Sequence, residues 1–457
     1  QGGFQEVEQM NLFKDMVCYQ EEVRDPSRMA EVLNRVIEKA FRGSAPAQIN
    51  VPRDYWTQVI DIELPPIVRF ERQGGGKTAI DQAAKILSNA KFPVILSGAG
   101  VVIGNAIEDC KKLAEKLDAP VCNGYQHNDS FPGSHPLAVG PLGYNGSKAA
   151  MELISKADVV LALGTRLNPF STLPGYGIDY WPKNATIVQV DMNPDRIGLT
   201  KKVTVGICGD AKMVSQQILE KLSPEAGNHG REDRKNLIHQ TKSSWLQTLT
   251  SLDHEDDDPG TVWNKEARER DKERMSPRQA WRAIQAGMPD NVIISSDIGN
   301  NCAIGNAYPT FEKGRKYLAP GLFGPCGYGF PSILGAKIGC PDTPVIGFAG
   351  DGAFGISMNE MSSCARKEWP PITMVIFRNY QWGAEKRNSI LWFDDNFVGT
   401  ELDPELSYAK VATACGLKGV TVKTMEETTN AIKLSCDDQK KGITTFIEII
   451  LNQELAE

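Results

Sequence analysis

The sequence predicts an α/β protein made of doubly wound, parallel-sheet domains. Short apolar runs alternate with amphipathic helical segments over residues 77–222 and again from Ser276 onward. Such alternation is typical of parallel strands joined by crossover helices. The 457 residues are enough for about three domains, and 41% hydrophobic with 23% charged residues is an ordinary globular composition. The composition therefore excludes a disordered chain.

Residues 1–65 contain too little for a domain of their own. They hold one amphipathic helix, Pro26–Phe41, and one short strand at residues 48–51. One helix and one strand cannot bury a core. The chain also starts at Gln1, with neither an initiator Met nor a signal peptide. We expect residues 1–65 to be the remnant of a larger domain whose beginning lies upstream.

We expect residues 66–225 to form a first complete parallel-sheet domain. We expect residues 226–275 to form a charged, solvated linker helix. The expected elements of the domain are the strands Pro93–Leu96, Val121–Cys122, Asp158–Leu163 and Thr186–Val190 and the helices Ala106–Leu117, Lys148–Lys156 and Ala211–Leu222.

Residues 276–457 predict a second parallel-sheet domain. Ser276 is a suitable N-cap for a helix with Pro277 in its first position. The expected strands are Val292–Ser295, Pro344–Ala349, Ile372–Phe377 and Thr444–Ile450, with a helix near Ala353–Lys367.

Charge and cysteine usage exclude several classes of function. The net charge of -7 argues against a nucleic-acid partner, and no apolar run approaches the length of a membrane span. The 10 cysteines form no C-x-x-C pair and there are only 5 histidines, which suits a reducing cytoplasm and argues against a His-rich metal site.

The motif with the clearest chemistry is Gly350-Asp351-Gly352, directly after an apolar strand. A helix and a second strand follow, and that strand ends at Arg378-Asn379. Asp351 and Asn379 should thus lie at the carboxyl ends of two parallel strands, where open α/β sheets bind ligands. Glycines let the backbone approach a phosphate, a helix N-terminus attracts anions, and oxygen ligands suit Mg²⁺.

This pattern resembles that of the thiamine-diphosphate (ThDP)-dependent, acetolactate synthase-like enzymes, in which Gly-Asp-Gly is followed at this distance by Asn-Asn. Here 25 residues, Ala353 to Phe377, separate the two parts. The first Asn is replaced by Arg378, and Asn379 matches the second. The resemblance implies ThDP and Mg²⁺ as cofactors, with Asp351, Asn379 and the carbonyl of Gln381 as metal ligands.

Two further segments match the family's cofactor-binding loops. Residues 296–301 resemble a diphosphate-contacting loop, and residues 324–331 resemble the turn beneath the thiazolium. Cys326 occupies the place of a bulky Met in acetolactate synthases and is alternatively a small buried hydrophobe. The cofactor-binding residues that the resemblance implies are Ile298, Gly299, Asn300, Asn301, Cys326, Gly350, Asp351, Gly352, Ala353, Asn379 and Gln381.

The middle domain gives only a weak nucleotide signal. Gly98-Ala99-Gly100 with Gly104 follows a strand, but no acidic residue follows Val121-Cys122, where a ribose-binding carboxylate is expected. In acetolactate synthase-like enzymes the corresponding Rossmann-like domain holds FAD in some members and is empty in others.

Residues 125–136, 140–148 and 377–388 narrow the resemblance to the branch of the family whose members act on sulfoacetaldehyde. The implied reaction is an acetyl transfer in taurine metabolism, from sulfoacetaldehyde and phosphate to acetyl phosphate and sulfite. Lys386, Arg387 and Arg378 are then candidates to contact the sulfonate or phosphate, or else are surface charges. His127 is a candidate proton shuttle or a structural loop residue, and Gln5 a pocket residue or an exposed one.

The resemblance also sets expectations for what lies outside the chain. Family members use a Glu of a pyrimidine-binding domain to activate the cofactor, and no residue here matches it. Because the cofactor lies between subunits in the family, we expect a cytoplasmic homodimer or homotetramer. The alternatives are a 2-keto acid carboligase or decarboxylase like acetolactate synthase, and a non-catalytic ThDP-binding chain.

Overall fold

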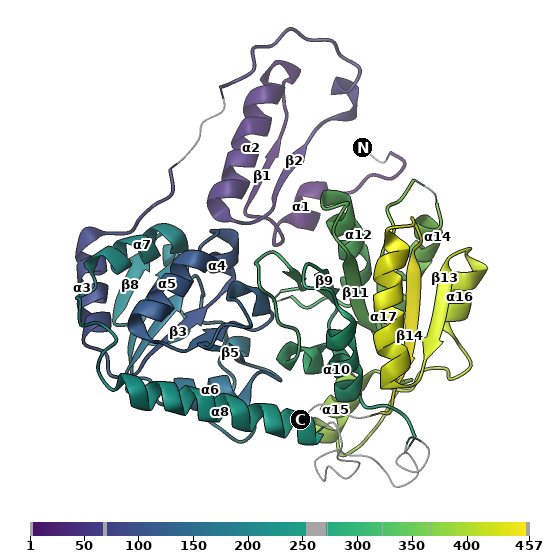
Figure 1. Ribbon diagram of the computed structural model, residues 1–457. Helices are drawn as coiled ribbons and strands as arrows, with labels where there is room; N and C mark the ends of the chain where they lie inside the picture. Colours follow the sequence, from purple (N-terminus) through teal and green to yellow (C-terminus); the bar gives the residue numbers. More distant parts are fainter. Residues whose placement is uncertain are drawn as a thin grey trace. The chain divides into compact units, whose positions relative to one another are not determined.

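The computed structural model describes residues 3–66, 71–252, 271, 273–321, 323–366 and 368–453. Residues 253–270 of the predicted linker lie outside this part of the chain. The chain divides into two compact units, Gln1–Arg72 and Gln73–Glu457, and we describe each by itself (Figure 1).

The first unit is a small α/β fragment. Strands β1 and β2 pair in parallel and α2 packs on them, with Val23, Val32 and Val36 buried at the contact. Helix α2 corresponds to the helix predicted at Pro26–Phe41, whereas β1 was not predicted. The elements are α1 (Gln9–Phe13), β1 (Tyr19–Glu22), α2 (Met29–Gly43) and β2 (Ala47–Asn50).

The second unit begins with a six-stranded, entirely parallel sheet in the order β5-β4-β3-β6-β7-β8. In sequence order this is 3-2-1-4-5-6, the doubly wound arrangement of Rossmann folds. Its elements are α3 (Lys77–Ser88), β3 (Pro93–Ser97), α4 (Ala99–Ile103), α5 (Ile107–Leu117), β4 (Val121–Asn123), β5 (Ala138–Pro141), α6 (Lys148–Ile154), β6 (Val159–Leu163), β7 (Thr186–Asp191), β8 (Val205–Cys208), α7 (Ala211–Lys221) and the long helix α8 (Arg231–Leu252).

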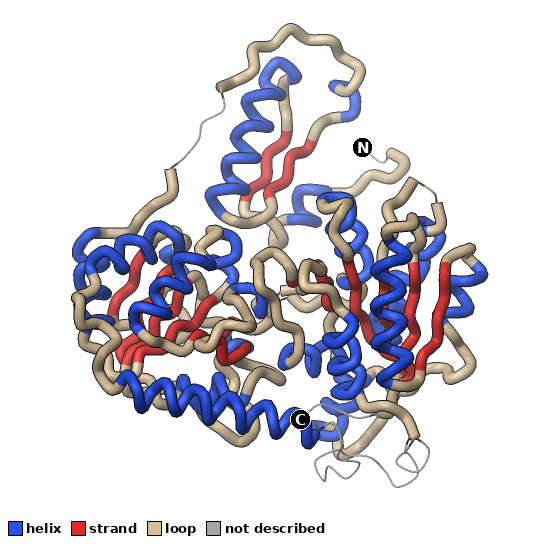
Figure 2. Tube along the Cα trace, viewed as in Figure 1, coloured by secondary structure: helices blue, strands red, loops and turns tan. Residues whose placement is uncertain are grey.

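The second sheet of this unit is also parallel, in the order β10-β9-β11-β12-β14-β13. Figure 1 labels its strands β9, β11, β14 and β13, and Figure 2 shows the strands in red. Its elements are α10 (Pro277–Gly287), β9 (Ile293–Ser296), α11 (Asn300–Ile304), β10 (Tyr317–Leu318), α12 (Gly329–Gly339), β11 (Val345–Gly350), α13 (Asp351–Ser357), α14 (Met361–Cys364), β12 (Thr373–Arg378), α15 (Gly383–Trp392), α16 (Tyr408–Ala414), β13 (Lys418–Val422), α17 (Met425–Gln439) and β14 (Thr445–Ile450).

Alternate residues of the second sheet enter separate hydrophobic cores. Ile346 and Phe348 of β11 pack with the helices α10 and α17, whereas Val345 and Ala349 pack on the other face with α12 and α16. A strand that is buried on both faces reads as a continuous apolar run. This is why β11 and β12 were predictable, and the predicted doubly wound α/β class is confirmed.

The predicted strands correspond to the inner strands of the two sheets, β3, β4, β6, β7, β9, β11, β12 and β14. Within these two sheets, the strands that sequence reasoning missed are the edge strands β5, β8, β10 and β13. The helix predicted near Ala353–Lys367 is broken, because α13 ends at Ser357 and a 3-10 turn separates it from α14. None of the described helices combines the length and the apolar character that crossing a membrane requires.

Candidate cofactor site

A cavity of about 190 Å³ lies where the order of the second sheet reverses direction. The chain passes from β9 outward to β10 and then back to β11, so the loops after β9 and β11 diverge at this point. The residues that line the cavity include all of those predicted to bind the cofactor: Ile298, Gly299, Asn300, Asn301, Cys326, Gly350, Asp351, Gly352, Ala353, Asn379 and Gln381.

Three polar groups converge in the wall of this cavity: the Asp351 carboxylate, the Asn379 side-chain amide and the Gln381 backbone carbonyl. The amide end of Asn379 lies 3.3 Å from Asp351 Oδ1 and 3.3 Å from the carbonyl oxygen of Gln381. If the Asn379 amide nitrogen faces these two oxygens, it donates a hydrogen bond to both. If a cation lies among the three groups, the amide oxygen faces it instead and all three groups can act as oxygen ligands. Mg²⁺ ligands about 2.1 Å from the ion, at right angles, lie roughly 3.0 Å apart. The residues present therefore fit the predicted metal.

Asp351 is held by its neighbours and almost completely buried. Its Oδ2 accepts hydrogen bonds from the backbone N–H of Tyr380 at 2.7 Å and from Arg378 Nη1 at 2.9 Å. Its Oδ1 accepts from the N–H of Gly352 at 3.0 Å. Burial raises the pKa of Asp351 to about 6, while the Arg378 charge and the N–H donors act in the opposite direction.

Glycines give the cavity its space at two positions. A Cβ at Gly350 would meet no atom within 4 Å, and the same holds for Gly299, whose φ of +119° disfavours other residues. At Gly352 a side chain is excluded by packing within the protein, because a Cβ would lie 2.8 Å from the ring of Trp382. The backbone at Gly299 and Gly350 is thus open to a ligand such as a diphosphate.

Asp297 joins two walls of the cavity and was not among the predicted residues. Its carboxylate accepts hydrogen bonds from the N–H groups of Ile298 at 2.8 Å, Gly327 at 3.1 Å and Gly329 at 2.7 Å. Burial raises the pKa of Asp297 and these N–H groups lower it. A carboxylate directly after a strand, two residues before Gly299, was the available signal. Further lining residues not predicted are Gly324, Trp382, Gly383, Ala384 and Glu385.

Cys326 lies in the cavity wall, where the resemblance placed it. Its thiol is partly buried, and burial raises its pKa, with smaller contributions from the charges of Asp297 and Glu385. Its contact with the thiazolium stays a prediction.

The three cations predicted near the site differ in their surroundings. Arg378 is 1% exposed and its guanidinium contacts Asp351, so it is directed into the protein. Lys386 pairs with Glu401 at 2.5 Å. Arg387 donates from Nη1 to the hydroxyl of Tyr144 at 2.7 Å, and no carboxylate of the described residues pairs with it.

The structure does not bring His127 to the cavity. His127 lies in the loop after β4, where burial and then the charge of Arg166 lower its pKa to about 4. Gln5 belongs to the first unit, where it is exposed with a φ of +64°. The predicted roles of both residues stay predictions.

In the first sheet the strand order reverses between β3 and β6, and we call this place, like the corresponding one between β9 and β11, a reversal point. The glycines here allow two loops to pack closely. A Cβ at Gly98 would lie 2.6 Å from the carbonyl oxygen of Gly164, and one at Gly100 would lie 2.6 Å from Gly164 Cα. The N–H of Gly100 also donates to Gly164 O at 2.8 Å. This close approach explains the glycines without a bound dinucleotide.

A larger cavity of about 1,120 Å³ is bordered by α8, β5 and the end of α10. It contains none of the predicted cofactor residues, and its size alone assigns it no chemistry. The described residues also contain no cluster of three or more His, Cys, Asp or Glu side chains that could hold a metal. An amide and a backbone carbonyl complete the oxygen cluster at Asp351, so it is not of that kind.

Comparisons with known proteins agree with this geometry. The central domain of thiamine pyrophosphate enzymes matches residues 80–222, and their C-terminal TPP binding domain matches residues 297–449. A protein of Rhizobium meliloti named probable sulfoacetaldehyde acetyltransferase is 77% identical over 457 residues, which cover 100% of this chain and 77% of the relative. The chain belongs to the thiamine pyrophosphate enzymes, in the sulfoacetaldehyde acetyltransferase family. Its cofactor is therefore thiamine pyrophosphate, another name for ThDP, together with Mg²⁺.

Other relatives of this sulfoacetaldehyde acetyltransferase family member place it within the wider group. The sulfoacetaldehyde acetyltransferase of Roseovarius nubinhibens is 73% identical over the full chain and 76% of its own length. A probable acetolactate synthase large subunit of Methanococcus aeolicus is 28% identical, covering 95% of this chain and 73% of the relative. The structure of benzoylformate decarboxylase from Polynucleobacter necessarius, at 20% identity, has a TM-score of 0.76 over 98% of this chain and 78% of its own, which shows the shared fold.

Proposed function

We propose that this chain catalyses acetyl transfer from sulfoacetaldehyde to phosphate, giving acetyl phosphate and sulfite. The observation that carries the proposal is the difference between 77% identity to a protein named probable sulfoacetaldehyde acetyltransferase and 28% identity to one named probable acetolactate synthase large subunit. The cavity supports it, because the predicted cofactor residues come together there. A 2-keto acid carboligase is less well supported.

The residues at the cavity would hold the cofactor by its metal and its diphosphate. Asp351 Oδ1, the Asn379 amide oxygen and the Gln381 carbonyl oxygen would ligate Mg²⁺. The loops at Gly299 and Gly350 would accept the diphosphate. When bound, ThDP supplies the carbanion chemistry, and the protein orients the reactants and stabilises charge.

Arg387 is our candidate for the substrate anion. Both substrates are anionic, and a guanidinium binds sulfonate or phosphate oxygens through parallel N–H donors. Arg387 is one helical turn beyond Gly383 and Ala384, which line the cavity, and shares their face of α15. Lys386 is engaged by Glu401, and Arg378 is buried against Asp351. Tyr144, from the loop after β5, orients the Arg387 guanidinium.

His127 and Gln5 complete the proposed active-site residues. With a pKa of about 4, His127 is neutral near pH 7 and is able only to accept a proton at its free nitrogen. We further propose a cytoplasmic homodimer or homotetramer, as the resemblance implies. Light scattering on the purified protein distinguishes the two assemblies from a monomer.

The test is sulfite release by the purified protein with ThDP, Mg²⁺ and sulfoacetaldehyde, with and without phosphate. We expect sulfite and acetyl phosphate in equal amounts, both dependent on phosphate. Arg387→Met should raise the KM for phosphate or sulfoacetaldehyde about tenfold or more and leave ThDP affinity unchanged. Pyruvate consumption without sulfite release would instead favour the carboligase, and ThDP binding without any turnover would favour a non-catalytic chain.

A further inference from the structure

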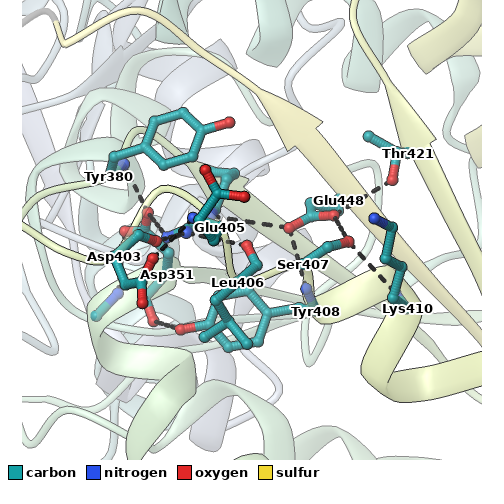
Figure 3. A network of polar contacts seen from close by, with 12 residues as sticks. Asp351, Tyr380, Asp403, Glu405, Leu406, Ser407, Tyr408, Lys410, Thr421 and Glu448 are labelled. Atoms are coloured by element: carbon teal, nitrogen blue, oxygen red, sulfur yellow. Dashed lines mark hydrogen bonds and ion pairs between the residues drawn. The ribbon is translucent and has the colours of Figure 1, made fainter. Parts of the chain in front are cut away.

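Arg378 stands at the end of β12, next to the metal ligand Asn379, in an environment built around its charge. Its Nη1 donates to Asp351 Oδ2 at 2.9 Å. Its Nη2 donates to the carbonyl oxygens of Asp403 and, at 3.0 Å, Leu406. Figure 3 shows the polar contacts around Asp351 and Glu448, together with Asp403, Leu406, Ser407 and Tyr408.

The same guanidinium lies between two buried carboxylates. Glu448, on the neighbouring strand β14, is 2% exposed, and its Oε1 lies 3.8 Å from Arg378 Nε. Glu448 also accepts hydrogen bonds from Ser407 Oγ at 2.6 Å and from the N–H of Tyr408 at 3.1 Å. In the part of the chain that the structure describes, Arg378 is the only cation paired with either carboxylate.

Aromatic rings fix the plane of the guanidinium. Its carbon lies 4.3 Å from the ring centroid of Tyr380 and 5.5 Å from that of Tyr408. The Tyr408 hydroxyl donates to the backbone carbonyl oxygen of Asp351 at 2.8 Å. A planar cation packed against rings and hydrogen-bonded to carbonyls has little rotational freedom, so the group it holds is fixed as well.

We propose that Arg378 is a positioning residue for the Mg²⁺ of the cofactor. By holding Asp351 Oδ2 it leaves Oδ1 turned toward Asn379 and Gln381, so that Asp351 offers a single oxygen to the metal. Through Glu448 and the carbonyls of residues 403–406, it also ties the metal half-site to β14 and to the segment before α16. The geometry of the metal site therefore depends on a charge balance among three buried side chains.

This inference concerns cofactor binding and does not depend on which substrate is turned over. Simple removal of Arg378 leaves two buried carboxylates unpaired, which destabilises the fold for reasons unrelated to the metal. The informative variant is therefore the double substitution Arg378→Gln with Glu448→Gln, compared with Glu448→Gln alone. It removes the cation together with the carboxylate that has no part in metal binding.

The measurement is Mg²⁺ affinity at fixed ThDP, read by calorimetry or by quenching of tryptophan fluorescence, since Trp382 lines the cavity. We expect the double variant to fold but to melt several degrees below Glu448→Gln, because Asp351 loses its cation, and to bind Mg²⁺ about 10–100-fold more weakly, the usual effect of removing a group that orients a metal ligand. The Mg²⁺ affinity of Arg378→Lys should lie between those of the parent protein and the double variant, because an ammonium can reach Asp351 but lacks the planar donor geometry of a guanidinium.

A matched control is Arg274→Gln, since Arg274 also packs over the Tyr380 ring, 4.9 Å from its centroid, and pairs with Asp271 instead of Asp351. Its Mg²⁺ affinity should be unchanged. Equal Mg²⁺ affinity in the double variant and in Glu448→Gln would overturn the positioning role. A double variant that does not fold would contradict the charge balance, and a loss as large in Arg274→Gln would assign the effect to Tyr380 packing.

Discussion

The two parallel sheets of the second unit share an architecture but use their reversal points differently. In the first sheet, the loops after β3 and β6 meet directly, and the Cβ of any residue at Gly98 or Gly100 would collide with the backbone at Gly164. In the second sheet, the loops after β9 and β11 stand apart around a cavity of about 190 Å³. Glycine at a reversal point therefore indicates close backbone packing in one sheet and space for a ligand in the other.

The polar groups at the two sheets also differ in whether they are arranged to bind a ligand. Around the second cavity, the Asn379 amide lies 3.3 Å from both Asp351 Oδ1 and the Gln381 carbonyl oxygen. At the first sheet, Asp191 at the end of β7 accepts a hydrogen bond from the N–H of Asn193 at 2.9 Å and so caps its own loop. The groups around Asp351 can therefore converge on a cation, whereas the Asp191 carboxylate binds the backbone of its own loop.

The largest effect should follow Asp351→Asn. It removes the charged ligand of the oxygen cluster, and we expect Mg²⁺–ThDP affinity to fall by at least about 100-fold. Asp191→Asn is the matched control in the other sheet and should leave this affinity within about twofold. Calorimetric titration with ThDP at fixed Mg²⁺ measures both. Similar losses in the two variants would remove the contrast between the sheets.

Gly100→Ala tests the closed reversal point. The added methyl lies 2.6 Å from Gly164 Cα, and backbone cannot move aside as a flexible side chain does. We expect a loss of about 2 kcal/mol of unfolding free energy, with unchanged ThDP affinity of the folded protein. Urea denaturation gives the first quantity and calorimetry the second. A fully stable variant would mean that the two loops are not in contact.

Gly350→Ala is the counterpart at the open reversal point. The methyl meets no atom within 4 Å, and the φ of -68° at Gly350 is accessible to alanine. The free energy of unfolding without cofactor should stay within about 0.5 kcal/mol of the parent. ThDP affinity should fall about tenfold, equivalent to about 1.4 kcal/mol, because the methyl occupies cofactor space. Unchanged affinity would place the diphosphate elsewhere.

The smallest effect concerns the pH dependence of His127, which lies near the closed reversal point, its ring 3.7 Å from a Cβ built at Gly124. The folded pKa of about 4 is below the ordinary value of 6.5, so the unfolded chain binds more protons between these limits. Stability is therefore complete above about pH 6.5 and falls as the pH drops toward 4. His127→Gln should reduce by about 1 kcal/mol the stability lost between pH 7.5 and 5.5, measured by urea denaturation. An unchanged loss would show that the imidazole is hydrated.

Whether a strand could be predicted from the sequence depends on how deeply it is buried. The inner strands, such as β3 and β12, are covered on both faces and have uninterrupted apolar runs. The edge strand β8 alternates buried and more exposed residues, and β13 has only one buried residue, Val422. β10 has only two residues. Edge strands pair with one neighbour and need fewer apolar residues, so their signal is weak.

In the candidate site, the residues that could be predicted are those whose signal lies within one short stretch of sequence. Asp351, Asn379 and the glycines were predictable because each lies at or shortly after the end of a strand, in a motif that is continuous in sequence. The contact of Arg387 with Tyr144 spans 243 positions, and that of Gly329 with Asp297 spans 32. No local pattern encodes such pairs. For Arg378, the sequence predicted a cation near an anion site, and only packing identifies Asp351 and Glu448 as its partners.

The most direct test of the central claim is a crystal of the protein with ThDP and Mn²⁺ in place of Mg²⁺, with the anomalous signal locating the metal. We predict one strong peak within about 2.1–2.3 Å of Asp351 Oδ1, the Asn379 amide oxygen and the Gln381 carbonyl oxygen. A diphosphate should lie beside Gly299 and Gly350. A peak at any other place, or a ThDP molecule bound away from the reversal point of the second sheet, would contradict it.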